Sequence, residues 1–162
     1  MTYVFHYASP LGALTLCSDG AALAGLYFDG QRHFLEGCPG PYEEAPTAVF
    51  EQSARWLDAY FAGDVPAFTP PLSPRGTPFR EVVWQALLEI PYGQTVTYGE
   101  LARRLGTSAR AVGGAVGLNP VSIVIPCHRV VGARGALTGY AAGVDIKARL
   151  LALERPAASG NP

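Results

Sequence analysis

Apolar and polar side chains alternate along the first thirty residues of the chain, which is the pattern of half-buried β-strands. Tyr3, Phe5 and Tyr7 share one face of a first strand, and turn sequences at residues 9–12 and 18–20 separate it from two more. The chain therefore begins with a predicted antiparallel meander, whose strands cover residues 3–7, 13–17 and 21–28.

Helical spacing replaces this alternation from residue 50 onward. Phe50, Ala54, Leu57 and Phe61 fall on one face of a predicted helix that ends at Gly63. The same spacing predicts two later helices, one with Phe79, Val83, Ala86 and Ile90 on its apolar face and a C-terminal one with Ile146, Leu150 and Leu153.

Two short helices between these have clear start and stop signals. Thr97 and Glu100 have the spacing of a capping box, Gly106 ends the helix that follows, and Ser108 caps a second helix over residues 109–117. Two short helices joined by a tight glycine-containing turn have the outline of a helix-turn-helix. The second helix carries almost no bulky side chains. Because each interior glycine costs about 1 kcal/mol, we expect either tight packing on a neighbouring helix or close contact with a ligand.

Five prolines between Pro66 and Pro78 mark the clearest boundary in the chain, because proline disrupts both helices and strand pairing. The charge changes sign there: residues 1–74 have a net charge of −6 and residues 75–162 a net charge of +5. The basic half suggests a polyanionic partner, and ordinary solvated surface charge is the alternative. We expect two domains and a disordered tail, at residues 1–75, 76–156 and 157–162.

The composition is that of a globular protein. Of the 162 residues 49% are hydrophobic, with neither an apolar run of membrane length nor a basic segment leading into an apolar one at the N-terminus. The three cysteines, Cys17, Cys38 and Cys127, are irregularly spaced and do not predict a disulfide framework. We therefore expect a cytoplasmic protein that does not associate with membranes.

Candidate chemistry is concentrated at Pro126-Cys127-His128-Arg129, which follows the apolar run 121–125. β-Branched residues bounded by prolines predict a short buried strand that breaks into a turn at Cys127. Apolar surroundings raise the pKa of a thiol, so nucleophilic chemistry needs a base, and His128 is the adjacent candidate if the backbone bends or a water bridges the two. A buried structural cysteine beside a satisfied histidine is the alternative.

Together these motifs resemble the O6-alkylguanine DNA alkyltransferases, and most closely the bacterial Ogt-type members. The resemblance rests on residues 126–130, 110–115, Asn119-Pro120, Gly139-Tyr140 and 147–154, and more loosely on residues 9–28. It implies an α/β fold, with a small ribonuclease H-like N-terminal α/β domain and a mostly helical C-terminal domain that contains a winged-helix-like helix-turn-helix. It also implies a suicide repair protein, which flips the damaged base out of duplex DNA and moves its O6-alkyl group irreversibly to its own cysteine.

The resemblance also assigns roles at the reaction centre. Cys127 is the nucleophile, His128 activates it through a water, and Glu154 orients His128. Asn119 braces the turn, and Tyr98 donates a proton to guanine N3. The substrate pocket is formed by Val130, Tyr140 and Ala141, with backbone groups reading the edge of the guanine.

For DNA binding, the resemblance implies that the bare helix lies in the minor groove, where small side chains allow a close approach. Arg110 fills the gap left by the flipped base. The DNA-contacting residues implied are Arg110, Ala111, Gly113, Gly114 and Val116. The expected partner is double-stranded DNA carrying O6-alkylguanine, bound by a monomer; activity on O4-alkylthymine and cooperativity on DNA stay open.

No cofactor and no metal are expected. Some relatives bind zinc in the first domain, but His6, Cys17, His33 and Cys38 do not match that ligand arrangement.

Three other functions fit parts of the pattern. Alkyltransferase-like proteins recognise lesions without transferring the alkyl group, and they have another residue in place of the cysteine. Regulators controlled by cysteine methylation carry extra DNA-binding and metal-binding segments, for which this chain has no room. A cysteine hydrolase would leave the glycine-rich helix unexplained. The combination of Cys127, His128 and Glu154 therefore favours alkyl transfer.

Overall fold

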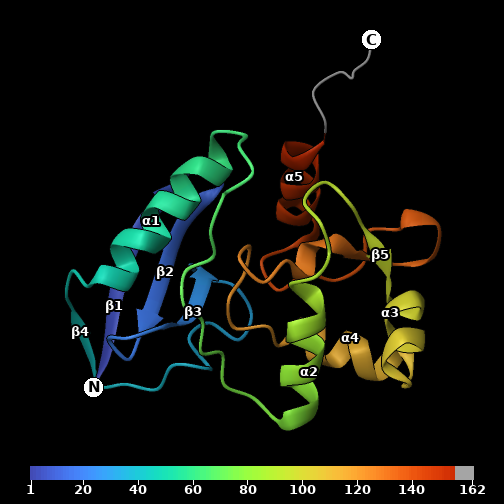
Figure 1. Ribbon diagram of the computed structural model, residues 1–162, viewed down its shortest axis with the longest axis horizontal. Coiled ribbons are helices and arrows are strands. Elements are labelled where there is room, and N and C mark those ends of the chain that lie inside the picture. The colour runs from blue at the N-terminus through green and yellow to red at the C-terminus, as the bar shows by residue number, and fades with distance from the viewer. Residues whose placement is uncertain (156–162) are drawn as a thin grey trace.

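The structure, a computed structural model, describes residues 1–155, so the predicted disordered tail lies outside the described residues. An N-terminal sheet covered by one helix lies beside a C-terminal group of helices (Figure 1), which confirms the predicted α/β fold. Within the described part of the chain, no helix is both long and apolar enough to cross a membrane. The domain boundary at residues 75 and 76 stays a prediction.

The N-terminal sheet has four strands in the order β3-β2-β1-β4. The predicted meander is confirmed, since β1 pairs antiparallel with β2 and β2 pairs antiparallel with β3. A short fourth strand, which the sequence did not predict, pairs parallel with β1. The strands are β1 (Thr2–Ser9), β2 (Gly12–Ser18), β3 (Leu23–Phe28) and β4 (Tyr42–Glu44).

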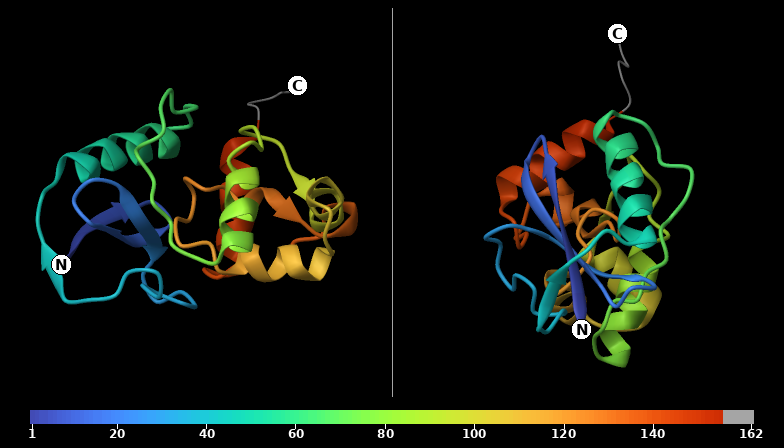
Figure 2. Two further views of the ribbon diagram at one scale, coloured as in Figure 1. Left: turned by 60° about the horizontal axis from the view of Figure 1, so that its bottom comes forward. Right: turned by 90° about the vertical axis from the view of Figure 1, so that its left-hand side faces the viewer.

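Helix α1 (Ala48–Phe61) packs along this sheet and also faces the C-terminal half of the molecule (Figure 2). Phe50 and Leu57 are buried as predicted, and Trp56 and Tyr60 are buried as well. The two other predicted residues are only half-buried. The buried face is wider than the predicted stripe because Tyr60 contacts the C-terminal half, where its ring lies 6.1 Å from that of Tyr92.

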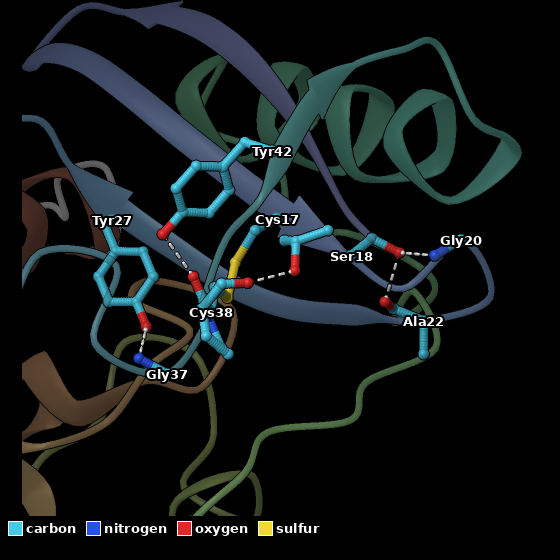
Figure 3. Close-up of a disulfide and its surroundings, with 10 residues drawn as sticks. Cys17, Ser18, Gly20, Ala22, Tyr27, Gly37, Cys38 and Tyr42 are labelled. Carbon is cyan, nitrogen blue, oxygen red and sulfur yellow. Dashed lines mark hydrogen bonds between the residues drawn. A yellow bond between two sulfur atoms is a disulfide. The ribbon is translucent and has the colours of Figure 1, made fainter.

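A disulfide joins Cys17 in β2 to Cys38 in the loop before β4 (Figure 3). The prediction that the cysteines form no disulfide framework is therefore wrong for this pair. The two residues are 21 positions apart, and only the folding of the loop back over β2 brings them together. Gly25 makes room for both sulfur atoms, because a Cβ at that position would lie 2.5 Å from the Cys17 sulfur and 2.7 Å from the Cys38 sulfur.

The outer edge of β3 is hydrogen-bonded to two segments that are distant in sequence. One is the proline-rich linker, bonded to Leu23. The other directly precedes the predicted reactive turn: the Leu26 N–H donates to the Pro120 carbonyl at 2.8 Å, and the Ser122 N–H donates to the Leu26 carbonyl at 2.9 Å. The N-terminal sheet thus holds the backbone that leads to Cys127.

Up to residue 155, the C-terminal half contains four helices and a two-stranded parallel sheet. The helices are α2 (Pro78–Leu87), α3 (Tyr98–Leu105), α4 (Ala109–Gly117) and α5 (Val144–Glu154). The strands are β5 (Val96–Thr97) and β6 (Val130–Val131). Short 3-10 turns at Cys127–Arg129 and Ala133–Gly135 complete this half.

The residues that were predicted to begin and end the two short helices do so in the structure. The Thr97 side chain accepts from the Glu100 N–H, and the Glu100 carboxylate accepts from the Thr97 N–H, which together form the capping box. Gly106 ends α3 in the left-handed conformation, with φ of 68°. The Ser108 side chain caps α4 by accepting from the Ala111 N–H. The helix pair is therefore confirmed.

Helix α2 differs from its prediction. It ends at Leu87, and Phe79 is 39% exposed although the helical spacing predicted it on the buried face. Trp84 occupies the interior instead and donates its indole N–H to the Ala115 carbonyl at 2.8 Å. One large aromatic with a satisfied polar atom thus sets the rotation of the helix.

The predicted strand over residues 121–125 is wrong. Apart from one bridge between Val121 and Leu26, the segment is a buried turn, in which Ile123 has a positive φ of 72°. The Val124 N–H donates to the Ser122 carbonyl at 2.8 Å, and the Ile125 N–H donates to the Val121 carbonyl at 3.0 Å. Backbone hydrogen bonds within the segment therefore take the place of the bonds that a neighbouring strand would form. Periodicity alone cannot distinguish such a turn from a buried strand.

The larger of two hydrophobic clusters in residues 1–155 runs through both halves, and the smaller one surrounds the disulfide. The larger cluster joins residues of the sheet and α1, such as Leu16, Phe50 and Leu57, to Val83 of α2 and Leu150 of α5. The N-terminal half and the reactive turn therefore share one packed interior.

Candidate active site

Cys127 begins a 3-10 turn directly after Pro126, and it is buried, with 5% of its surface exposed. Burial raises the pKa of the thiol, while a hydrogen bond with Asn119 and the positive charge of Lys147 act in the opposite direction. From this turn the side chains of His128 and Arg129 both reach Glu154, whereas Cys127 lines a cavity. Arg129 was not among the predicted site residues, although a charged residue in a buried apolar run is a signal for one.

Asn119 holds this turn through its side-chain amide. Its Nδ2 donates to the Ile125 carbonyl at 2.8 Å, and its Oδ1 accepts from the Val121 N–H at 3.0 Å. A buried turn lacks the ladder bonds of a strand, so a side chain must satisfy these groups. The predicted bracing contact is present in the structure.

His128 is completely buried, and its Nε2 lies 2.6 Å from Oε2 of Glu154. The carboxylate can only accept, which makes Nε2 the donor and leaves Nδ1 with a free lone pair. Nδ1 is buried, and no group among residues 1–155 forms a hydrogen bond with it. The thiol of Cys127 therefore does not bond to Nδ1 directly. Burial lowers the pKa of His128, although the hydrogen bond to Glu154 opposes that shift. His128 is thus held as a neutral imidazole with a free lone pair on Nδ1.

Glu154, the last residue of α5, accepts hydrogen bonds from four residues. Besides His128, these are the Tyr60 hydroxyl at 2.6 Å, Arg129 Nε and Nη2 at 2.8 and 3.1 Å, and the Gly93 N–H at 3.1 Å. Burial alone would raise the pKa of Glu154, but the bonds from His128, Arg129 and Tyr60 hold it below its usual value. Glu154 is therefore an anion inside the protein. Nothing in the sequence pointed to Tyr60.

Lys147 is a third residue, after Arg129 and Tyr60, to which the sequence assigned no role. It is fully buried, its Nζ donates to the Thr138 carbonyl at 3.2 Å, and it lies 5.8 Å from the centre of the Tyr98 ring. Burial lowers the pKa of Lys147, whereas negative charge on the neighbouring Cys127 sulfur raises it. A cation here stabilises a thiolate over a thiol.

Cys127 lines a small cavity of about 40 Å³ that adjoins a larger one of about 480 Å³. The two share six lining residues, which are Tyr98, Gly113, Gly117, Gly139, Tyr140 and Ala141. The larger volume is in the range of small-molecule sites. Tyr98, Tyr140 and Ala141 thus border the same space, and their roles toward a guanine stay predictions. Val130 does not line either cavity, because its place in β6 turns its side chain into the core.

The mouth of the larger cavity lies beside α4, whose outer surface is bare. Arg110 is exposed at the start of this helix. A Cβ on Gly114 or Gly117 would meet no atom within 4 Å, so packing on a neighbouring helix does not explain these glycines. Val116 differs from the other predicted DNA contacts, because it is buried and lines the small cavity.

No group of three or more histidine, cysteine or acidic side chains within residues 1–155 is arranged to hold a metal ion. Two of the four candidates considered from the sequence, Cys17 and Cys38, are joined to each other.

Comparison with known proteins agrees with this geometry. Residues 78–156 match the family model of the 6-O-methylguanine DNA methyltransferase DNA-binding domain, and residues 2–74 match the model of the ribonuclease-like domain of the same family. A methylated-DNA–protein-cysteine methyltransferase of Methanosarcina acetivorans is 46% identical over 154 residues, covering 94% of this chain and 97% of that protein. One from Haemophilus influenzae is 42% identical over 158 residues, covering 94% and 86%.

The crystal structure of Mycobacterium tuberculosis OGT in complex with DNA superposes with a TM-score of 0.86 at 43% identity, covering 96% of each chain. The O6-methylguanine-DNA methyltransferase of Pyrococcus kodakaraensis superposes with a TM-score of 0.71 at 29% identity, covering 95% of this chain and 99% of that one. The chain therefore belongs to the O6-methylguanine DNA methyltransferase family, as its motifs indicate, and is a methyltransferase of DNA alkyl repair.

Proposed function

We propose that the protein transfers an alkyl group from O6 of guanine in duplex DNA to the sulfur of Cys127, once per molecule. The observation that carries this proposal is the buried array in which Cys127 lies at a cavity and the next residue, His128, is held by Glu154 at 2.6 Å. A general base has this arrangement: a carboxylate fixes one ring nitrogen of the histidine, here Nε2, and the other, Nδ1, is free to accept a proton.

The reaction is a displacement at carbon. The thiol proton passes to His128 Nδ1 through a water, the bond from sulfur to the alkyl carbon forms, and the bond from that carbon to O6 breaks. The electron pair of the broken bond stays on guanine, which takes a proton at N3 from the hydroxyl of Tyr98. The proton held on His128 returns to Tyr98 through solvent, and unmodified guanine leaves.

Two features of the site support these steps. Lys147 is buried near Cys127 and favours the thiolate, which partly offsets the effect of burial on the thiol pKa. Tyr98 lines both cavities and so borders the space that a base would enter. Tyr140 and Ala141 wall the same space.

We further propose that duplex DNA binds across α4 by its minor groove, with the damaged base flipped into the larger cavity. The exposed Arg110, the open surface at Gly114, and the half-buried Ala111 and Gly113 support a close approach of the DNA backbone. Arg103 and Arg104 on α3 are exposed and can contact phosphates. A structural relative, the OGT of Mycobacterium tuberculosis, has been crystallised with DNA.

The test is intact-protein mass spectrometry of the full chain after mixing with a duplex that contains one O6-methylguanine. We expect a stoichiometric gain of one methyl group, located on Cys127 by peptide mapping, and no gain with an unmodified duplex or in Cys127→Ala. A parallel duplex with O4-methylthymine shows whether that lesion is also a substrate. Lesion-selective binding without methyl gain would contradict the proposal and indicate a lesion-sensing binder. No binding at all would indicate a structural cysteine.

A further inference from the structure

The catalytic array contains one side chain from the N-terminal half of the protein. Tyr60 of α1 is completely buried, and its hydroxyl donates to Oε2 of Glu154 at 2.6 Å across a sequence separation of 94 residues. The same oxygen accepts from Nε2 of His128, also at 2.6 Å. Two short hydrogen bonds from different halves of the chain therefore meet on one carboxylate oxygen.

The ring of Tyr60 is fixed by its neighbours, so its hydroxyl has a defined direction. It stacks on Trp56 with ring centres 5.3 Å apart and 9° between the planes, and Phe61 and Tyr92 pack against it edge to face. Its centre also lies 6.5 Å from that of the His128 ring. A donor held this rigidly fixes the position of its acceptor.

We propose that Tyr60 is a positioning residue for alkyl transfer, which fixes the Glu154 oxygen that holds His128 and limits the basicity of that oxygen. This role rests on the proposed function of Cys127 and His128. A carboxylate oxygen that already accepts a strong bond from Tyr60 stabilises an imidazolium less than a free one would. His128 therefore stays neutral at rest and can take the thiol proton.

Other ionisable groups also face this array, and the proposal must hold in their presence. Arg129 pairs with Glu154 and disfavours a second positive charge on His128, and Lys147 of α5 acts in the same direction. Neither contacts Tyr60 by a hydrogen bond, so each stays in place when the Tyr60 hydroxyl is removed. The ionisable groups around His128 and Glu154 are Tyr60, Tyr92, Cys127, Arg129, Tyr140 and Lys147.

The variant Tyr60→Phe removes the hydroxyl and keeps the ring. Single-turnover transfer from a duplex with O6-methylguanine is measured against pH in the full-length protein, and the His128 ring is titrated independently by nitrogen NMR. We expect the midpoint of the acid limb and the His128 titration to move together to higher pH by about one unit, the size expected when a bond to a charged group is lost.

A matched control separates this effect from simple loss of stability. Tyr27 is also a buried tyrosine of the N-terminal half, and its hydroxyl accepts from the Gly37 N–H at 3.0 Å, away from Glu154. Tyr27→Phe should leave both midpoints unchanged. If Tyr60→Phe folds poorly, 3-fluorotyrosine at position 60 keeps the bond with a more acidic donor and should move both midpoints to lower pH.

The outcomes distinguish the two proposals. A wild-type protein that fails to transfer refutes the proposed function, whatever the titration of His128 shows. A wild-type protein that transfers, with unchanged midpoints in both Tyr60 variants, refutes the positioning role even if those variants are slower or less stable. Parallel shifts in the Tyr60 variants, absent from Tyr27→Phe, support it.

Discussion

Arg129 and Glu154 form an ion pair in the interior of the protein, with Nε of the arginine 2.8 Å from Oε1 of the glutamate. The guanidinium also donates to the Ile90 carbonyl at 2.8 Å and lies 5.6 Å from the centre of the Tyr92 ring. Because His128 and Arg129 are adjacent on one 3-10 turn, a single carboxylate holds the imidazole and neutralises the neighbouring cation. The chemistry of the turn and its stability thus depend on the same residue.

Removal of the Glu154 charge should therefore affect folding and reaction together. Glu154→Gln leaves Arg129 buried without its counter-charge, and we expect a loss of about 3–5 kcal/mol in the free energy of unfolding. The transfer rate should fall in the fraction that stays folded, because the acceptor of the His128 hydrogen bond loses its negative charge. Denaturant unfolding and single-turnover transfer measure the two effects. Glu89→Gln, at an exposed position, is the control; a normal stability for Glu154→Gln would contradict the ion-pair assignment.

Stability should depend on pH through His128. Burial holds its pKa in the folded protein below the ordinary value of 6.5, so the unfolded chain binds the proton more readily. The contribution of His128 is therefore complete above about pH 6.5 and is lost as the pH falls toward the folded-state pKa. Glu154, with its lowered pKa, adds a loss of the same sign at more acidic pH.

Thermal unfolding between pH 8 and pH 5 measures this dependence. The wild-type melting temperature should decline below about pH 6.5. His128→Asn should show a shallower decline over the same interval, while Gln94→Asn, at an exposed residue that does not titrate, should keep the wild-type slope. An equal slope in all three proteins would mean that the pKa of His128 is the same in the folded and unfolded states.

Short-range features of this fold were predictable from sequence, because they depend on residues a few positions apart. The capping box of Thr97 and Glu100 and the helix end at Gly106 need no tertiary contact, and the structure has both. The alternation of more and less buried residues around Phe5 is likewise a local pattern, which the sequence shows directly.

Long-range features were not predictable in this way. The buried turn at Ile123 looks like a strand in sequence, and the bonds that identify it come from Asn119 and from β3. Glu154 was assigned only through the family resemblance, and Tyr60 was not assigned at all, since 94 residues separate the two. A residue that is buried against an element far away in the sequence has no local sequence pattern that would reveal the contact.

Arg110 tests the proposed DNA complex separately from the chemistry. Its side chain is exposed, so Arg110→Ala should leave the free energy of unfolding unchanged. Without an arginine to occupy the space of the flipped base, we expect transfer from a duplex to slow about tenfold, or about 1.4 kcal/mol. Transfer from the free base O6-methylguanine should be unaffected. Arg55→Ala, at an exposed arginine on α1, is the control, and equal losses on both substrates would place Arg110 outside the DNA interface.

Gly114 separates the demands of folding from those of DNA binding. It lies inside α4, is exposed, and has room for a Cβ, with no atom within 4 Å. Gly114→Ala should therefore stabilise the protein by up to about 1 kcal/mol, since alanine favours a helix more than glycine does. Gly114→Leu should also fold, but its side chain would keep α4 away from the floor of a groove and weaken lesion binding strongly.

The comparison of the two variants is informative because it separates two quantities. Gly114→Ala should raise the stability of the protein, and Gly114→Leu should lower its affinity for the lesion-containing duplex. Chemical unfolding gives the first quantity and a fluorescence titration with a lesion-containing duplex gives the second. If Gly114→Leu binds the duplex as tightly as wild type, the bare surface of α4 does not contact DNA. If Gly114→Ala is destabilised, the glycine has a role within the fold that the open space around it does not indicate. A stabilised but weakly binding protein would show that DNA binding, rather than packing, accounts for the glycine.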